Sequence, residues 1–137
     1  MKKTKYYLFD TNILSELIKN PSGILAQKIV KLDNTSFCTS IIVACELRYG
    51  ALKKNSKHLI SRVELLLSNI IVQPLSDDVD RYYAKLRVVL EKKGQIISAN
   101  DMLIAAHALT LDAILITANE REFLRVPDLS VENWLKN

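Results

Sequence analysis

Three acidic residues, Asp10, Glu46 and Asp101, are the side chains of this sequence best suited to do chemistry together. Asp10 ends the apolar run YYLF, Glu46 lies inside the apolar stretch SIIVACELRYGAL, and Asp101 opens a further one, DMLIAAHALTL. Two carboxylates about 4 Å apart repel by roughly 4 kcal/mol at an effective dielectric of 20, so a cluster stays ionised only around a cation. Oxygen ligands without softer donors select Mg²⁺ or Mn²⁺, ions that polarise phosphodiesters and make hydroxide from bound water.

Each acid also has a purely structural explanation. Asp10 and Asp101 stand at the beginnings of predicted helices, where aspartate is favoured as an N-cap or in the first turn. Glu46 follows apolar residues one helical turn before it, so we expect it near the core-facing side of its helix. A carboxylate there is costly unless it binds a metal or pairs with a distant Lys or Arg. Taken one at a time, the acids therefore leave helix caps and a buried ion pair open.

The elements that must position these acids follow from the spacing of apolar residues and helix breakers. We expect strands at 5–9, 36–39, 70–73, 114–117 and 129–131, and helices at 11–19, 24–32, 40–53, 57–68, 77–93 and 100–111. Ser22 and Ser76 are expected caps, with Asp77 and Asp78 in a first turn.

The short, apolar strands alternate with helices, which is typical of a sheet covered on both faces. The pattern predicts an α/β fold, a three-layer α/β/α sandwich with a short, mainly parallel sheet. In such sheets, sites form beyond the carboxyl ends of the strands. Asp10 and residues 117–119 follow predicted strands at that edge, and Glu46 and Asp101 lie on helices that can reach it.

Length and composition limit the number of domains and the classes of function that the chain can have. The 137 residues predict one domain over 1–137, and a net charge of +4 permits a polyanionic partner without requiring one. The chain has no apolar stretch of about 18 residues, so no membrane span is expected. The apolar run after the basic N-terminus stops at Asp10, so we expect no export signal and a cytoplasmic protein. Cys38 and Cys45 are expected to be reduced and structural, and the distant His58 and His107 predict no zinc site.

Four segments in order resemble the motif set of PIN-domain ribonucleases, and in particular the VapC-type toxins of bacterial toxin–antitoxin pairs. They are FDTNIL, TSIIVACELRYGA, ANDMLIAAHAL and ILITANEREFLRVPDLSVENW, and the resemblance runs from residue 6 to residue 134. D-T-N alone is common, whereas the ordered set in so short a chain is specific. The resemblance implies a single PIN-like domain that cuts RNA phosphodiesters with a metal-activated water.

The resemblance also implies roles for individual residues. Asp10, Glu46 and Asp101 would be the metal-binding carboxylates for Mg²⁺ or Mn²⁺, and Asn119 would complete the catalytic set. Where some family members carry Asp, this chain has Asn119, which would hold a metal-bound water or orient Asp10. Glu120 is an alternative fourth acid, or else a solvated loop charge.

Neighbouring residues receive lesser roles. The resemblance implies that Thr11 and Asn12 shape the first turn of the helix after Asp10. Thr117 would complete the site, and Phe123 would pack in the core. Glu122 is interpreted as a surface or salt-bridged residue, Ser40 as an N-cap, and His107 as a core residue rather than a general base. Basic residues would carry the RNA backbone: Lys53, Lys54, Lys57, Arg62, Lys92, Lys93, Arg121 and Arg125.

Two protein partners follow from the resemblance. One is a second copy of this chain, in a homodimer. The other is a small VapB-like antitoxin whose C-terminal segment lies across the site and blocks it. The amphipathic helices at 12–19, 24–32 and 57–68 would supply a hydrophobic groove for it, unless their apolar faces are all core.

Other classes of function remain to be weighed against this one. A receiver-like signalling module would bind Mg²⁺ without cutting anything, but it places paired acids near the first strand and a lysine after a late strand. This chain has a lone Asp10 and no lysine after ILIT. A structural role for all three acids conflicts with Glu46 in an apolar helix. A DNA nuclease would use the same metal chemistry, and the residues themselves do not separate RNA from DNA.

Overall fold

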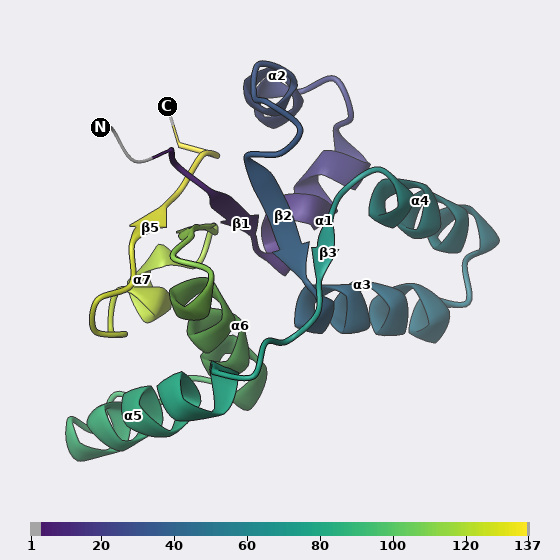
Figure 1. Cartoon of the computed structure of the whole chain (residues 1–137). Helices are drawn as coiled ribbons and strands as arrows, with labels where there is room; N and C mark the ends of the chain where they lie inside the picture. The colour runs from purple at the N-terminus through teal and green to yellow at the C-terminus, as the bar shows by residue number, and fades with distance from the viewer. Residues whose placement is uncertain (1–3, 137) are drawn as a thin grey trace.

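A five-stranded parallel sheet forms the centre of the molecule, in a computed structural model that describes residues 4–136 (Figure 1). The spatial order is β3-β2-β1-β4-β5, and every neighbouring pair is parallel. The strands are β1 (Tyr7–Phe9), β2 (Phe37–Ser40), β3 (Val72–Gln73), β4 (Ile114–Ile116) and β5 (Val131–Glu132). Residues 1–3, which begin the segment that we rejected as an export signal, and residue 137 lie outside the described residues.

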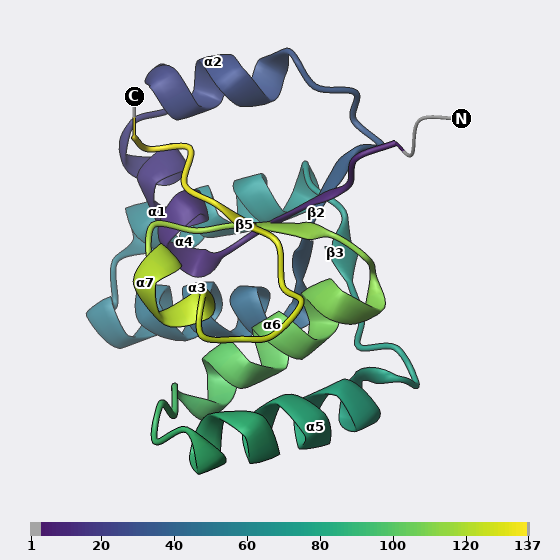
Figure 2. The ribbon, with the colours of Figure 1, turned by 90° about the vertical axis from the view of Figure 1, so that its left-hand side faces the viewer.

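Helices cover both faces of this sheet. They are α1 (Thr11–Lys19), α2 (Ile24–Val30), α3 (Ile41–Lys54), α4 (Lys57–Ser68), α5 (Val79–Lys92), α6 (Ala99–Thr110) and α7 (Glu120–Phe123). In Figure 2 the strands cross the middle of the molecule, with α1 and α2 above them and α5 and α6 below. The predicted three-layer α/β/α sandwich is confirmed, and its sheet is parallel throughout the described residues.

The strands are apolar because they are buried from both sides. Leu8, Phe9, Leu115 and Ile116 are fully buried in the two central strands, where both successive residues of each strand meet a helical layer. A strand with only one covered face would instead alternate apolar and polar residues. Among the described helices, none is long and apolar enough to cross a membrane.

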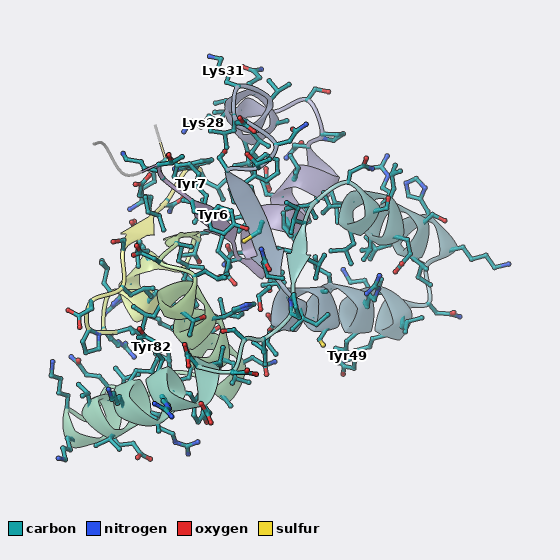
Figure 3. The ribbon with its side chains drawn as sticks, in the orientation of Figure 1. Tyr6, Tyr7, Lys28, Lys31, Tyr49 and Tyr82 are labelled. Atoms are coloured by element: carbon teal, nitrogen blue, oxygen red, sulfur yellow. The ribbon has the colours of Figure 1, made fainter. Side chains whose placement is uncertain are left out.

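An aromatic cluster fastens the C-terminal segment to the sheet. The Trp134 ring lies 4.9 Å from the ring of Tyr7 and 5.6 Å from that of Phe9, both in edge-to-face arrangements. Lys28 of α2, labelled with Tyr7 in Figure 3, donates to the Trp134 carbonyl at 2.8 Å. These contacts tie α2 and the C-terminal segment to β1.

Several local predictions are wrong, each for a physical reason. The N-caps of α2 and α5 are Gly23 and Asp78, not Ser22 and Ser76, and neither cap uses a side-chain hydrogen bond. Residues 76–78 form a turn in which the Val79 N–H donates to the Ser76 carbonyl, so α5 begins two residues later than expected. Its first-turn acid is therefore Asp80.

The presence of the short helix α7 and the exposure of Cys45 also differ from expectation. Four residues carry too little periodicity to predict a helix such as α7. Cys38 is buried in β2 as expected, but Cys45 is exposed on α3, and both thiols are free. Cys45 lies on a solvent-facing side of α3 that also carries Tyr49 and Leu52, so this helix is not buried all round.

Candidate active site

A cleft of about 440 Å³ lies beyond the carboxyl ends of β1, β2 and β4 and collects acids from three helical segments. Its lining includes all four predicted catalytic residues, Asp10, Glu46, Asp101 and Asn119. Figure 2 shows why they can meet: α7 and the first turns of α1 and α6 lie along the same side of the ribbon, left in that view. The sequence separates these residues widely, and the parallel register brings them to one edge.

Asp10 acts as a helix cap and a cleft residue at once. Its Oδ1 accepts from the Thr11 N–H at 2.8 Å, which caps α1. Its Oδ2 accepts from the Thr117 hydroxyl at 2.8 Å and from the Asn12 amide at 3.4 Å. Burial raises the pKa of Asp10, the hydrogen bonds from Thr117 and Thr11 lower it, and the charge of Glu46 raises it again. The carboxylate is thus held in place by neutral donors rather than by a cation.

Glu46 enters the cleft from the second turn of α3. The side chain is half-buried at the edge of the helix rather than on its core-facing side, where Val43 and Leu47 are buried. Its Oε1 accepts from the Thr11 hydroxyl at 2.5 Å. Among the described residues it forms no salt bridge, so the buried ion pair that would have explained it structurally is absent there.

Asp101 lies in the first turn of α6, where Ser98 is the cap. The Ser98 hydroxyl accepts from the Asp101 N–H at 3.2 Å, and Asp101 lines the cleft. Burial raises the pKa of Asp101 to about 6, and the charges of Asp10, Glu46 and Glu122 contribute in the same direction. The Asp101 carboxylate therefore belongs to an electrostatically crowded acidic group as well as to the first turn of α6.

A network of hydrogen bonds between the segments that follow β1 and β4 forms the floor of the cleft. The Asn12 side chain accepts from the Ala118 N–H at 2.9 Å, and the Thr117 hydroxyl accepts from the Asn119 N–H at 2.9 Å. These contacts couple the loop after β4 to the first turn of α1. The residues that touch Asp10 are thus Thr117 and Asn12, while Asn119 reaches it only through Thr117.

The two acids after β4 have different neighbours, and neither of them lines the cleft. Glu120 pairs with Lys136 and does not line the cleft, so it is not the fourth acid in this structure. Glu122, interpreted as a surface residue, accepts from the Asn119 amide at 3.1 Å and is close enough to raise the pKa of Asp101. Its position two residues after Glu120, on the other side of α7, is the only signal that could have identified it.

One basic residue that the sequence did not single out lines the cleft. Lys19, the last residue of α1, forms no ion pair within residues 4–136 and faces the acidic group. The basic residues predicted to bind RNA are not part of this lining. Arg62 donates instead to the Ile18 carbonyl at 2.9 Å, and Arg125 donates to the Ile96 carbonyl at 3.3 Å.

His107 is a core residue, as expected. Its Nδ1 lies 2.8 Å from the Ser40 hydroxyl, which also caps α3 by accepting from the Ile42 N–H. Burial lowers the pKa of His107, while the Pro74 carbonyl acts in the opposite direction. The imidazole is fully buried under β2 and does not line the cleft, so it cannot act there as a general base.

The acidic group suits a divalent cation by its chemistry, although it is not closed into a ligand cage. No three His, Cys, Asp or Glu side chains of residues 4–136 already converge on one point that would hold a metal ion. Asp10, Glu46 and Asp101 nevertheless offer only oxygen donors, share one cleft and have no cationic partner among the described ion pairs. Carboxylates in this state fit Mg²⁺ or Mn²⁺ rather than softer metals.

Comparison with known proteins decides the family. The sequence profile of the PIN domain matches residues 7–129. The chain belongs to the PIN-domain family. Ribonuclease VapC2 of Rickettsia felis is 39% identical to this PIN domain over 132 residues, which are 95% of this chain and 98% of the relative. Ribonuclease VapC1 of Haemophilus influenzae (strain R2866) is 38% identical with the same coverage.

Solved structures agree with the sequence relatives. A chain in the crystal structure of VapBC2 from Rickettsia felis, bound to a DNA fragment from their promoter, superposes on this PIN domain with a TM-score of 0.88. It is 37% identical, and the match covers 94% of this chain and 98% of that one. VapBC-1 from nontypeable Haemophilus influenzae gives a TM-score of 0.84 at 36% identity, covering 96% and 99%. The predicted resemblance to PIN-domain VapC proteins is confirmed.

Proposed function

We propose that this PIN domain is the ribonuclease toxin of a VapBC-type toxin–antitoxin pair and that it cuts RNA with Mg²⁺ or Mn²⁺. The observation that carries the proposal is the acidic cleft: Asp10, Glu46 and Asp101 share one space, Glu16 also lines it, and none of these carboxylates has a cationic partner among the described ion pairs. A purely structural role would not gather like charges that raise the pKa of Asp10 and Asp101. RNA is the proposed substrate because the relatives are named ribonucleases.

Asp10, Glu46 and Asp101 would hold the ion, with Glu122 as a nearby fourth acid. When bound, the metal supplies an activated water for in-line attack and stabilises the leaving oxygen. Thr117 and Asn12 hold the Asp10 carboxylate at 2.8 and 3.4 Å, and Thr11 holds Glu46 at 2.5 Å. Lys19 would neutralise an incoming phosphate at the rim. RNA as substrate and two free thiols support a cytoplasmic setting.

An apolar groove between α1, α2 and α4 supports an antitoxin as the protein partner. Its volume is about 560 Å³, and its lining includes Leu17, Ile29, Val30, Leu65 and Leu66. Val30 and Leu65 are 79% and 65% exposed, so the apolar faces of these helices are not all used by the core. The groove fits an apolar antitoxin segment, whose C-terminal end would continue past Ile18 and Lys19 toward the acids.

A homodimer is the second proposed assembly. Tyr49 and Leu52 on α3 are 65% and 66% exposed, and Tyr82 on α5 is 41% exposed. Figure 3 shows Tyr49 and Tyr82 on the two helical arms at the lower side of the molecule. Apolar side chains of this size at the surface favour burial against a second copy.

The test of the proposed function combines metal binding with RNA cleavage for wild type and Glu46→Gln. We expect wild type to bind Mn²⁺ in calorimetry and to cut total RNA with Mg²⁺ but not with EDTA. Glu46→Gln removes a proposed ligand oxygen's charge and should lower both metal affinity and cleavage by about 100-fold or more. Circular dichroism checks that the variant is folded.

Glu64→Gln is the matched control. Glu64 is an exposed glutamate on α4 that pairs with Arg48 at 2.8 Å, outside the cleft. This variant should bind metal and cut RNA as wild type does. If Glu46→Gln keeps full activity and metal binding, Glu46 is a structural charge and the proposed mechanism is wrong.

A further inference from the structure

A second hollow opens directly beside the acidic cleft. It has a volume of about 190 Å³ and lies between α1, α3 and α4, which pack against one another in Figure 1. Thr11, Ser15, Lys19 and Glu46 line both spaces, so a ligand bound at the acids can extend into the hollow without leaving the protein surface. We call this space the side pocket.

The far wall of the side pocket is apolar. Leu47 and Ala51 of α3 and Val63 of α4 are buried behind it, and Leu59 is half-buried at its edge. Hydroxyl groups of Thr11 and Ser15 stand at its mouth. This combination suits a flat ring system that carries polar atoms on its edge. The volume is below that of pockets that take drug-sized ligands, so it fits one ring system rather than a whole nucleotide.

Gly50 leaves the side pocket open, and the helix itself gives no reason for a glycine there. It lies inside α3, where glycine costs about 1 kcal/mol relative to alanine. Its φ is not in the left-handed region, and a Cβ added at this position would meet no atom within 4 Å. Neither backbone strain nor close packing therefore demands glycine. Its effect is to keep side-chain atoms out of a wall of the pocket.

Two lysines flank the side pocket. Lys19 ends α1, Lys54 ends α3, and both line the pocket. Neither forms an ion pair with any residue from 4 to 136. A phosphodiester chain that approaches the acids is repelled by the cleft carboxylates. Unpaired cations on either side of the pocket would offset this repulsion.

We infer that the side pocket binds the base of a nucleotide next to the scissile phosphate, while Lys19 and Lys54 contact the adjoining phosphates. This inference rests on the proposed function. Single-stranded RNA presents unstacked bases, which proteins hold against apolar or aromatic surfaces and read by their polar edges. The side pocket would then align the scissile phosphate with the acids and contribute to the choice of cleavage position.

The test pairs a blocked pocket with RNA that lacks the base. After the cleavage position is mapped in total RNA, short single-stranded RNAs are made with an abasic nucleotide immediately before or after the scissile phosphate. Wild type should lose about 5- to 150-fold in kcat/KM on one of the two abasic RNAs, the range expected for one stacked base. Gly50→Leu fills the pocket and should cut the intact RNA and that abasic RNA at equal, reduced rates. Gly50→Ala should fall between.

Lysine variants provide a matched pair. Lys54→Ala should lower kcat/KM and weaken its salt dependence, because a phosphate contact is lost. Lys85→Ala should do neither, since Lys85 is an exposed lysine of α5 that does not line the pocket. Thermal melting checks folding, and the glycine substitutions should not lower stability because they favour the helix.

Each contrary result has a separate meaning. If the ratio of the two cleavage rates, intact RNA over abasic RNA, is the same for Gly50→Leu as for wild type, the base is not in the side pocket. If the Gly50 variants cut both RNAs like wild type but escape inhibition by an antitoxin, the pocket holds an antitoxin side chain and the inference is overturned. If wild type cuts no RNA with Mg²⁺, the proposed function fails, and the inference fails with it.

Discussion

Asp10 illustrates how one residue can satisfy two explanations that looked like alternatives. One carboxylate oxygen caps α1 through the Thr11 N–H, and the other accepts from the Thr117 hydroxyl in the cleft. Because an aspartate has two oxygens with several lone pairs, capping does not exhaust its capacity. Ser40 also has two hydrogen-bonding roles, since its hydroxyl caps α3 and contacts His107. For a single residue, the role in the fold and the role in the site can therefore belong to different atoms of one side chain.

Thr117→Val tests the support of Asp10. The substitution keeps the shape but removes a donor 2.8 Å from a buried carboxylate oxygen, so it should lower the free energy of unfolding by about 1–3 kcal/mol. Urea unfolding in EDTA measures this. Thr110→Val is the control, because the Thr110 hydroxyl donates only to the His107 carbonyl of its own helix. Equal losses for the two variants would contradict a special role for Thr117.

Glu122→Gln and Glu120→Gln separate the two acids after β4. Glu122 is close enough to Asp101 to raise its pKa, whereas Glu120 pairs with Lys136 outside the cleft. Glu122→Gln should weaken Mn²⁺ binding by about 3- to 10-fold, since one nearby negative charge is lost. Glu120→Gln should change it by less than about 2-fold. Calorimetric titration with Mn²⁺ measures both affinities. A larger effect for Glu120→Gln would favour Glu120 as the fourth acid, as the sequence suggested.

Pairing of β1 with β2 and β4 is what assembles the cleft at the scale of elements. Phe9 is in register with Thr39 and Ile116, so the next residue of each segment, Asp10, Ser40 and Thr117, meets the others at one edge. Helices α3 and α6 then start from this edge region and carry Glu46 and Asp101 to it. A shift of one residue in this register would turn the Thr117 hydroxyl away from Asp10.

His107 joins α6 to β2, and its burial makes stability depend on pH. Its pKa is lowered in the folded state below the ordinary value of 6.5, so the unfolded chain binds the proton more readily. Stability from a neutral His107 is therefore present above pH 6.5 and is lost as pH falls through that value. His107→Asn keeps a polar group near Ser40 but cannot titrate. At pH 8 it should cost roughly 1–3 kcal/mol of the free energy of unfolding.

The difference between wild type and His107→Asn should then shrink between pH 6.5 and pH 5, because only wild type loses stability there through this group. Groups shared by both proteins cancel in the comparison. The Ser40 hydroxyl hydrogen-bonds to the ring and the Pro74 carbonyl raises the pKa of the ring, and neither group titrates in this range. Denaturant titrations at several pH values in EDTA give the curves. Parallel curves would show that His107 does not govern this pH dependence.

The whole molecule combines a basic surface with an acidic cleft. The net charge of +4 attracts a polyanion, but the cleft carboxylates repel it locally. The conflict disappears when a divalent cation occupies the cleft, so metal and RNA are expected to act together. The PIN domain is thus built around a site that is unfavourable when left without counter-charge, as expected where function outweighs stability.

Asp101→Asn should therefore change stability in opposite directions with and without metal. In EDTA it should raise the free energy of unfolding by about 1 kcal/mol, because like-charge repulsion with Asp10 and Glu46 is relieved. In Mn²⁺ at a hundred times its Kd, wild type should gain about 2.7 kcal/mol and the variant far less. Thermal melting in both conditions measures the crossover. A variant stabilised by Mn²⁺ as strongly as wild type would remove Asp101 from the ligand set.

The sequence by itself determined the order of strands and helices, the α/β class, the family and the placement of Asp10, Glu46 and Asp101 beside the strand ends. These are local or ordered patterns, since burial on both faces and helix periodicity are visible within a few residues of each position. Boundaries such as the start of α5 at Val79 escaped because a turn from Ser76 and a helix offer similar local hydrogen bonds.

Only the tertiary structure decided which residues after β4 face the cleft, that Lys19 lines it, and that Gly50 opens a pocket beside it. The choice between Glu120 and Glu122 depends on the rotation of a four-residue helix, and Lys19 and Asp101 line one cleft although they are more than half the chain apart. Such contacts follow from strand register and helix packing, which join residues far apart in sequence. No local pattern carries that information, because the distance between two elements is set by every side chain packed between them.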